Sequence, residues 1–276
     1  MQYDPIKNVI GDAAKKAPML RRFFYWILGV MFLRTWYVKR ALRELLSSKK
    51  AAFNLFDAGC GFGQYSYFIA KTFPTANIHA IDVKEDYIED SKQFFSAVGI
   101  SNVQFGIEDL TAPTHTDRFD FILSVDVMEH IADDVQVFKN FFKAMKIGGK
   151  LLIHTPSNLG GSDVHKEGDA SFVEEHARDG YSVEDITTKL RGAGFHVLYT
   201  KYSYGPVGTF AWRLVVKYPL LMVNASKAFF IVLPFYYLLT LWFSLILMWV
   251  DFNSNNTTGT GLLVAAEKTS CVKSIL

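Results

Sequence analysis

The sequence has very little cysteine and almost no excess charge. Its two cysteines, Cys60 and Cys271, are too few for a disulfide framework or a zinc-ligand spacing among 276 residues. Basic and acidic residues nearly balance, 29 against 27, so no strong positive field favours nucleic acid as a partner. The N-terminal stretch MQYDPIKNVIGD also lacks the basic residues and apolar core of a secretory signal. We expect a reduced, cytosolic catalytic part that does not bind nucleic acid.

Apolar residues, in contrast, are abundant. They make up 50% of the chain, aromatic residues make up 15%, and the mean hydropathy is +0.14, all on the apolar side for a soluble domain. Residues 20–46 are apolar and aromatic but are interrupted by basic side chains, and their uncharged core, residues 23–33, is shorter than the roughly 20 residues that span a bilayer. We expect one amphipathic helix here, which lies either at a membrane interface or as a cap on the catalytic domain.

A turn with three glycines follows a short apolar run. Residues 54–63 read NLFDAGCGFG, in which Asp57 closes the run and Gly59, Gly61 and Gly63 follow it. Glycine permits a positive φ and a close approach of backbone to a ligand, and a helix N-terminus offers unpaired N–H groups. The dinucleotide fingerprint places its third glycine one residue later, and the lysine of a P-loop is absent. The turn therefore predicts a nucleotide-type pocket of another kind.

Strands and helices alternate after residue 53. We expect strands at residues 53–57, 77–81, 103–107, 119–125, 150–155, 196–202 and 261–268, and helices at residues 64–72, 85–98 and 134–145. One more helix begins at Ser182, whose spacing to Asp185 is that of a capping box. This βαβα order predicts a parallel sheet with helices on both faces, in which ligands bind at the carboxyl ends of the strands.

The pattern D-x-G-x-G-x-G resembles the first motif of class I S-adenosylmethionine (SAM) dependent methyltransferases. Later segments resemble further motifs of that family in the same order, namely Glu108-Asp109, ILSVDVMEHI and MKIGGKLLIHTPSN. The narrower resemblance is to small-molecule or lipid methyltransferases of the UbiG and UbiE type, with a methyltransferase type 11 domain. The resemblance implies an α/β fold: a Rossmann-like seven-stranded sheet with helices on both faces, which binds SAM as its cofactor.

Two additions to that sheet give four expected segments. They are an N-terminal amphipathic helical segment (1–50), the SAM-binding catalytic domain (51–205), a hydrophobic helical insertion between strands 6 and 7 (206–258), and the last strand with its tail (259–276).

The insertion contains an uncharged run at residues 228–250, long enough by itself for a transmembrane helix. If the strands on both sides of it share one sheet, the chain must return to the side it left, which excludes a single crossing. The candidate partner, residues 210–223, is short and holds Arg213 and Lys217, which are costly at a bilayer centre. We expect a re-entrant or monotopic insertion that turns back at Pro234, or alternatively a buried helix at a homodimer interface.

The resemblance assigns the cofactor-binding residues. They are Asp57, Gly59, Gly61, Gly63, Asp82, Asp109 and Asp126. Asp82 follows the glycines by about 20 residues, where a carboxylate commonly accepts hydrogen bonds from ribose hydroxyls. Asp109 is expected to accept from the exocyclic amine of adenine.

Two histidines are candidates for a general base, because the unperturbed pKa of histidine lies near neutrality. His154 ends the fifth strand, and His176 lies in the polar segment 156–180. His176 could instead be a lid residue bonded to Glu174 or Glu175.

A third group, Asp126, Glu129 and His130, resembles the metal-binding E-x-x-E-H of some quinone-pathway O-methyltransferases, with Asp in place of the first Glu. We expect no metal, because Glu-His at this place is also widespread in methyltransferases without one.

Together, these features predict SAM-dependent methyl transfer to a lipophilic small molecule, of quinone, polyprenyl or other lipid type. The expected location is the cytoplasmic face of a membrane, with the membrane surface as a partner. One alternative is a methyltransferase of a soluble small molecule that forms a homodimer through the insertion. An alternative of another class is a SAM-binding membrane protein without catalysis.

Overall fold

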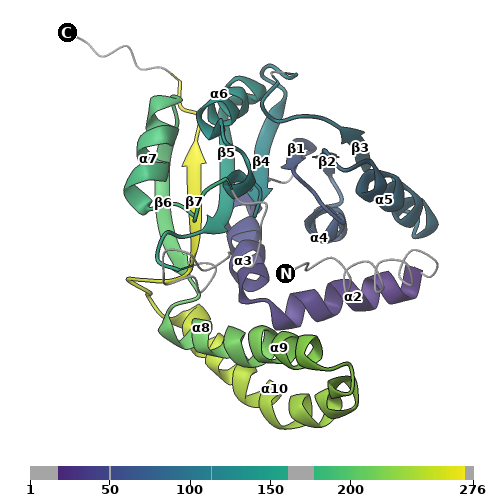
Figure 1. The fold of residues 1–276 in the computed structure, drawn as a ribbon. Helices are drawn as coiled ribbons and strands as arrows, with labels where there is room; N and C mark the ends of the chain where they lie inside the picture. The colour runs from purple at the N-terminus through teal and green to yellow at the C-terminus, as the bar shows by residue number, and fades with distance from the viewer. Residues whose placement is uncertain (1–17, 50, 113, 161–176, 271–276) are drawn as a thin grey trace.

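The computed structural model describes residues 18–49, 51–112, 114–160 and 177–270 (Figure 1). Within them, seven strands form one sheet in the order β3-β2-β1-β4-β5-β7-β6. Their bounds are β1 (Phe53–Ala58), β2 (Ala76–Asp82), β3 (Val103–Ile107), β4 (Phe119–Val125), β5 (Met145–Pro156), β6 (His196–Ser203) and β7 (Gly261–Glu267). The expected seven-stranded α/β fold is confirmed, except that β7 runs antiparallel to both β5 and β6.

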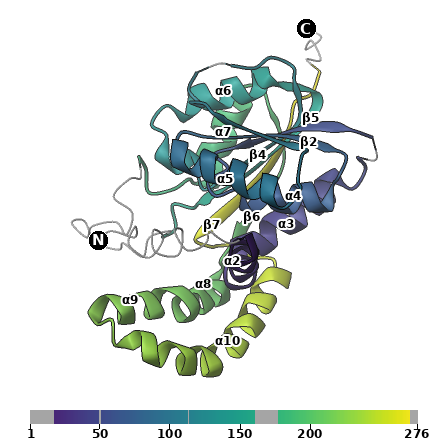
Figure 2. The same cartoon turned by 90° about the vertical axis from the view of Figure 1, so that its right-hand side faces the viewer.

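Helices cover both faces of the sheet. On one face, α3 (Leu33–Leu46), α4 (Gln64–Thr72) and α5 (Glu85–Ala97) pack against the strands around Leu55 and Leu123. On the other face lie α6 (Asp134–Ala144) and α7 (Val183–Gly192), which bury Phe138, Phe141 and Leu190 (Figures 1 and 2). Ser182 is the N-cap of α7, as the sequence predicted, because the N–H of Asp185 donates to its Oγ at 3.0 Å. Both apolar faces of the sheet are thus buried.

The N-terminal segment differs from the single helix expected over residues 20–46. It forms two helices, α2 (Pro18–Met31) and α3, which meet at Phe32, where the backbone is extended. Eight side chains of α3 are buried, so α3 caps the sheet. Helix α2 buries Arg21 and Tyr25 but exposes Met19, Leu20, Phe23 and Trp26. The cap interpretation is therefore correct for α3, whereas α2 keeps an exposed apolar side.

The insertion between β6 and β7 is a helical hairpin. Its first arm comprises α8 (Pro206–Trp212), a π-helical turn η2 (Arg213–Lys217) and α9 (Tyr218–Ala225), and its second arm is α10 (Phe229–Asn253). The two arms lie side by side below the sheet domain (Figures 1 and 2). The prediction that the chain turns back at Pro234 is wrong. The chain reverses at residues 226–228, and α10 continues through Pro234, which lies in its second turn.

Two tyrosines of α10 explain how residues 210–223 can act as the first arm. Tyr236 Oη donates to the carbonyl of Leu214 at 2.8 Å, and Tyr237 Oη donates to the carbonyl of Val215 at 2.9 Å. These carbonyls belong to the π-helical turn, where helical hydrogen bonding is distorted. The hydroxyl groups therefore join the two arms at the irregular turn.

The hairpin is attached to the sheet domain through Asp251, near the end of α10. This carboxylate is 1% exposed, and its Oδ1 accepts from Tyr37 Oη of α3 at 2.9 Å. Its Oδ2 accepts from the N–H of Gly208 at 3.0 Å, and Asn256 donates to Oδ1 at 3.2 Å. A Cβ on Gly208 would lie 2.6 Å from the carboxylate, so only glycine permits this approach. The sequence did not indicate this junction.

Candidate functional site

The glycine turn lies between β1 and α4, at the carboxyl ends of the parallel strands. Gly59, Gly61 and Gly63 have φ values of +83°, +51° and +73°, which side chains with a Cβ rarely adopt. A Cβ on Gly59 would come within 2.4 Å of Val127, whereas a Cβ on Gly61 would meet no atom within 4 Å. The turn is therefore packed tightly underneath at Gly59 and open at Gly61, as a cradle for a ligand requires.

Helix α2 holds this turn from the side. The Arg21 guanidinium donates to the carbonyl of Phe62 at 2.7 Å and to Ser91 Oγ at 3.0 Å, and it forms an ion pair with Asp90 at 3.1 Å. Tyr25 Oη also bonds to the carbonyl of Phe62. Phe62 lies between the second and third glycines, so the N-terminal helix positions the cradle directly. Sequence analysis treated Arg21 only as one of several basic residues in an amphipathic segment.

The expected cofactor carboxylates have different surroundings. Asp57 is 2% exposed and accepts from Ser66 Oγ at 2.5 Å, and burial raises its pKa to about 6. Asp82 Oδ2 accepts from the N–H of Gly61 at 2.9 Å. Asp109 is exposed at the end of β3 and accepts from the N–H and Oγ1 of Thr111 at 2.8 Å, both at its Oδ1. Asp57 thus braces the turn from below and Asp82 contacts it directly, whereas Asp109 follows β3, two strands away from β1.

Asp126 follows β4 and is paired within the protein. It has a φ of +52°, and its N–H donates to the carbonyl of His154 at 2.8 Å. Its Oδ1 bonds to Nδ1 of His154 at 3.0 Å, and its Oδ2 forms an ion pair with Arg34 of α3. Both the strand end and α3 therefore fix the orientation of this carboxylate, and Arg34 is a site residue that the sequence analysis did not single out.

His154 is buried at 3% exposure, with both ring nitrogens engaged. Nδ1 bonds to Asp126, and Nε2 lies 2.9 Å from Oγ of Ser203. Burial lowers the pKa of His154 to about 3, so the ring is neutral near pH 7. To take a proton from the methyl acceptor, His154 would first have to release Asp126 or Ser203. The second histidine predicted as a base, His176, lies outside the described residues.

Glu129 is a further buried titratable group beside this strand end. It lies in the short helix η1 (Met128–His130) directly after β4, is 2% exposed, and accepts from Thr155 Oγ1 at 3.1 Å. Burial raises its pKa to about 7, which suits a group that accepts a proton near neutral pH. The sequence analysis considered Glu129 only as a metal ligand. Its carboxylate and that of Asp126 bond to different partners, Thr155 on one side and Arg34 with His154 on the other.

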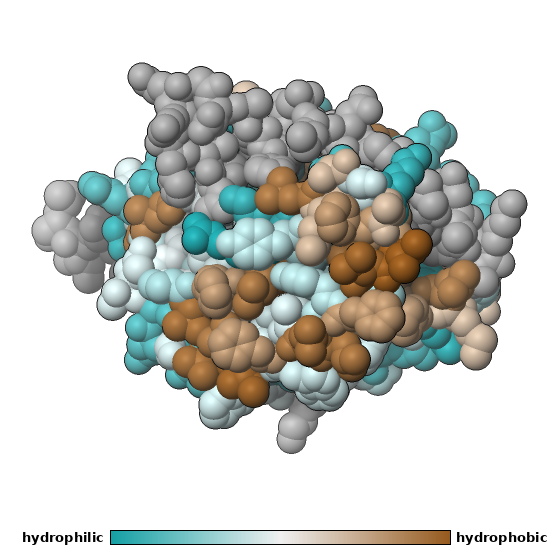
Figure 3. All heavy atoms as spheres, turned by 60° about the horizontal axis from the view of Figure 1, so that its bottom comes forward, coloured by the Kyte–Doolittle hydropathy of each residue, from teal (hydrophilic) through white to brown (hydrophobic). Residues whose placement is uncertain are grey.

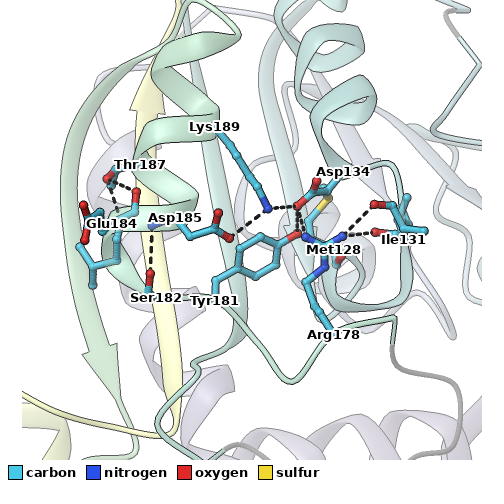
Figure 4. Close-up of polar contacts among 12 residues, drawn as sticks. Met128, Ile131, Asp134, Arg178, Tyr181, Ser182, Glu184, Asp185, Thr187 and Lys189 are labelled. Atoms are coloured by element: carbon cyan, nitrogen blue, oxygen red, sulfur yellow. Dashed lines mark hydrogen bonds and ion pairs between the residues drawn. The ribbon is translucent and has the colours of Figure 1, made fainter.

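The segment after the polar loop is held beside η1 by a buried carboxylate (Figure 4). Asp134 is 3% exposed and accepts from Tyr181 Oη at 2.6 Å and from Lys189 Nζ at 2.9 Å. Arg178 forms an ion pair with the same oxygen and donates to the carbonyl of Ile131 at 2.7 Å. This network fixes the start of the described residues 177–270 beside η1.

Two histidines and a glutamate meet on β2 and after β3. His79 Nε2 and His115 Nε2 lie 2.6 Å and 3.0 Å from the two oxygens of Glu108, and these atoms all lie within 4.8 Å of one another, as metal ligands would. Arg118, which can only donate, lies 3.2 Å from Nδ1 of His115. His115 therefore carries its proton on Nε2 and donates it to Glu108. The geometry is that of a hydrogen-bonded cluster.

A glycine cradle at β1, with carboxylates at the ends of β2, β3 and β4, is the arrangement expected for a nucleoside cofactor. Comparison with known families agrees, because a family model described as a methyltransferase domain matches residues 49–191, more than half of the chain. The chain belongs to this methyltransferase family. It is a class I SAM-dependent methyltransferase, and the narrower UbiG and UbiE subtype stays a prediction.

Curated relatives match the same region. Phosphoethanolamine N-methyltransferase 1 of Triticum aestivum is 32% identical over 149 residues, which are 53% of this chain and 29% of that protein. Malonyl-[acyl-carrier protein] O-methyltransferase 1 of Ilyobacter polytropus is 28% identical over 118 residues, 42% of this chain and 43% of that protein. The matched part therefore spans less than half of either relative.

Solved structures share the fold. Phosphoethanolamine N-methyltransferase 2 of Haemonchus contortus, in complex with S-adenosyl-L-methionine, has a TM-score of 0.60 at 19% identity, over 95% of this chain and 60% of that chain. A putative sarcosine dimethylglycine methyltransferase of Galdieria sulphuraria has a TM-score of 0.57 at 16% identity, over 84% and 82%.

The residues present fit SAM, the family's cofactor. The open side at Gly61 accommodates a ligand close to the backbone, and Asp82 beside it offers carboxylate oxygens suited to hydroxyl donors. When bound, SAM supplies an electrophilic methyl group on a sulfonium. The contribution of the protein is to align the acceptor and to exclude water.

Proposed function

We propose that this methyltransferase acts on a lipophilic acceptor, of quinone, polyprenyl or other lipid type, which it meets at the cytoplasmic surface of a membrane. The supporting observation is the large apolar surface of the hairpin. In α10, only Ser244, Met248 and Asp251 are buried. Its exposed apolar side chains include Ile231, Phe235, Leu238, Leu239, Trp242, Ile246 and Trp249, each more than 60% exposed.

These side chains gather on one side of the molecule. Figure 3 shows the underside, where apolar residues form a broad surface over the hairpin. Patches this large on a soluble monomer mark binding to a partner or a membrane. Within the described residues, α10 is the one helix long and apolar enough to cross a bilayer, and 6% of its most apolar window is buried. Both arms connect to strands of the same sheet, so the chain enters and leaves the bilayer on one side. We therefore favour a hairpin seated in one leaflet.

The apolar side of α2 supports the same orientation. Trp26 is 62% exposed and Phe23 is 56% exposed, on the side of α2 away from Arg21 and Tyr25. Aromatic side chains of this kind settle at membrane interfaces. Since Arg21 and Tyr25 bond to the cofactor turn, α2 would link the interface to the site where the methyl donor binds.

The experiment uses the full chain, vesicles of neutral and anionic phospholipids that contain a cellular lipid extract, and SAM with a labelled methyl group. We expect the protein to co-sediment with vesicles and the label to enter the organic phase. The variant Leu239→Glu/Trp242→Glu should lose co-sedimentation and lipid labelling by about tenfold, because it places charges in the apolar surface. Ile147→Glu, at an apolar residue of β5 that is 68% exposed, is the matched control and should change neither.

A label found only in a water-soluble product, with no co-sedimentation, would contradict the proposal. A homodimer of a soluble enzyme would then account for the apolar surface, and mass determination without detergent would detect it. Absence of any labelled product would favour the non-catalytic alternative.

The relatives favour a second candidate acceptor, a phosphorylated amine. Several phosphoethanolamine N-methyltransferases match about half of this chain at 31–33% identity. Phosphoethanolamine is therefore the polar acceptor to test beside the lipid extract. If this compound is labelled in preference to lipids, phosphoethanolamine becomes the proposed acceptor in place of a lipophilic molecule.

A further inference from the structure

Helix α2 has two different sides. Arg21 and Tyr25 are its buried side chains, and both bond to the carbonyl of Phe62 in the glycine turn. Phe23 lies two residues from each of them, so it projects from the opposite side of a helix with about 3.6 residues per turn. Its ring stacks on that of Trp26 with 5.8 Å between the centroids, and both side chains are more than half exposed. The same helix therefore holds the cofactor turn and exposes an aromatic pair.

The contacts of α2 with the sheet domain are centred on these two buried side chains. Arg21 reaches Ser91 Oγ at 3.0 Å and the carboxylate of Asp90 at 3.1 Å, both on α5. Tyr25 packs edge-on against the ring of Phe94, also on α5. An isolated helix of about 12–15 residues is only marginally stable in water, and α2 has 14 residues. Its helical form therefore depends on this docking and on whatever covers its other side.

The chain around α2 carries an excess of positive charge. Residues 18–49 hold seven basic residues and one acidic residue, although the whole chain is nearly balanced at 29 against 27. Arg22 is exposed on α2 itself. Lys39 and Arg43 of α3 both lie over the ring of Phe68, at 5.0 Å and 5.1 Å from its centroid. An exposed aromatic pair flanked by cations suits a bilayer with anionic headgroups, whereas a second copy of this chain would bring the same positive charge to the contact.

Helix α2 and the hairpin lie toward the same side of the molecule. In Figures 1 and 2, α2 is on the side of the sheet domain that faces the hairpin. A bilayer that receives the apolar surface of the hairpin would therefore also lie near the exposed side of α2.

We propose that an anionic bilayer on α2 and the cofactor in the glycine turn strengthen each other's binding. The bilayer binds the docked helix better than an unfolded segment, because only the helix gathers Phe23 and Trp26 on one side. The docked helix in turn keeps Arg21 and Tyr25 on the carbonyl of Phe62 and so fixes the turn that receives SAM. By linkage, each ligand raises the affinity of the other by the same factor. The inference rests on the membrane location proposed above.

The test measures the affinity of the full chain for S-adenosylhomocysteine by equilibrium dialysis. The three conditions are the protein alone, vesicles of phosphatidylcholine, and vesicles of phosphatidylcholine mixed with phosphatidylglycerol. We expect the anionic vesicles to tighten binding by about fivefold, the lower end of typical coupling between two sites, and the neutral vesicles by less than about twofold. S-adenosylhomocysteine should raise the affinity for anionic vesicles, measured by co-sedimentation, by the same factor as the vesicles raise its own.

Four variants separate the membrane side of α2 from its domain side. Phe23→Ala/Trp26→Ala changes exposed side chains, so it should keep the affinity measured without vesicles but lose the tightening. Arg21→Met should weaken S-adenosylhomocysteine binding without vesicles and lose the tightening, while the protein still co-sediments through the hairpin. Arg22→Glu should reduce the tightening by anionic vesicles, whereas Lys71→Glu, the same change at an exposed lysine of α4, should not.

The outcomes distinguish this coupling from the membrane location itself. Co-sedimentation with an unchanged affinity for S-adenosylhomocysteine would overturn the coupling and leave the membrane location intact, whereas absence of co-sedimentation would overturn both. Full tightening in Phe23→Ala/Trp26→Ala, or equal tightening by neutral vesicles, would also overturn the coupling. Tightening that follows protein concentration without vesicles would assign the exposed side of α2 to a second copy of the chain instead.

Discussion

Helices α3 and α10 reverse the usual relation between hydropathy and burial. Helix α3 holds four basic residues, yet eight of its fourteen side chains are buried against the sheet. Helix α10 has one charged residue in twenty-five, Asp251, and that residue is among the three that are buried. Position in the fold decides which face is covered, because α3 fills the space over β5, β6 and β7 whereas α10 packs mainly on the other arm of the hairpin. The average hydropathy of a helix therefore says little about its neighbours.

The largest expected difference between the two helices is in the effect of truncating one leucine in each. Leu42 of α3 is fully buried, and Leu239 of α10 is 79% exposed. Leu42→Ala should lower the free energy of unfolding by about 3 kcal/mol because it leaves a cavity. Leu239→Ala should change it by less than about 0.5 kcal/mol. Urea titration followed by circular dichroism measures both. Equal losses would show that the α10 surface is buried against another molecule.

The next largest expected loss of stability comes from removing Asp251, which attaches α10 to the sheet domain. Asp251→Ala leaves donors of Tyr37, Gly208 and Asn256 without their acceptor, so we expect a loss of about 2 kcal/mol and faster proteolysis of the hairpin. Asn253→Ala is the control, because its side chain bonds to an exposed carbonyl of the same helix. If the two variants unfold alike, Asp251 does not hold the hairpin to α3.

The buried carboxyl group of Glu129, in η1 beside the sheet, should make the stability of the sheet domain depend on pH. Since burial raises the pKa of Glu129 from its ordinary 4.5 to about 7, the folded state binds more protons between these values than the unfolded state. Stability from this group is therefore present at low pH and is lost as pH rises from 4.5 to 7. Glu129→Gln should raise the free energy of unfolding by about 3 kcal/mol at pH 8 and leave it unchanged at pH 4. A gain that is equal at both values would contradict the raised pKa.

The smallest expected change in stability is at Ser244 of the hairpin. Ser244 of α10 is buried, and its Oγ has no hydrogen-bond partner among the described residues. Ser244→Ala should stabilise the protein by about 0.5 kcal/mol at every pH, since it removes an unpaired polar atom. Thermal melting of the variant against the original chain measures the change. A loss of stability would show that the hydroxyl has a partner when the hairpin is in its working environment.

The sequence predicted the α/β sheet domain well, for a physical reason. Glycines at 59, 61 and 63 suit a turn with positive φ. Asp82 ends β2 and Asp126 follows β4, so both lie at the carboxyl edge of the parallel strands. The sequence predicted the N-terminal segment and the hairpin less well. Phe32 carries no breaker signal, and the return at residues 226–228 has neither proline nor glycine. Both bends come from packing against the domain.

The sequence by itself determined the fold family, the cofactor cradle and the presence of an unusually apolar insertion, because these depend on local pattern and on glycine geometry. Tertiary structure alone decided which residues complete the site. Arg34, Arg21 and Tyr25 lie far from the glycines along the chain, and only the packing of α2 and α3 brings them to the turn. It also decided that His154 is buried with both nitrogens engaged, since hydrogen-bond partners depend on neighbours across strands that sequence spacing does not encode.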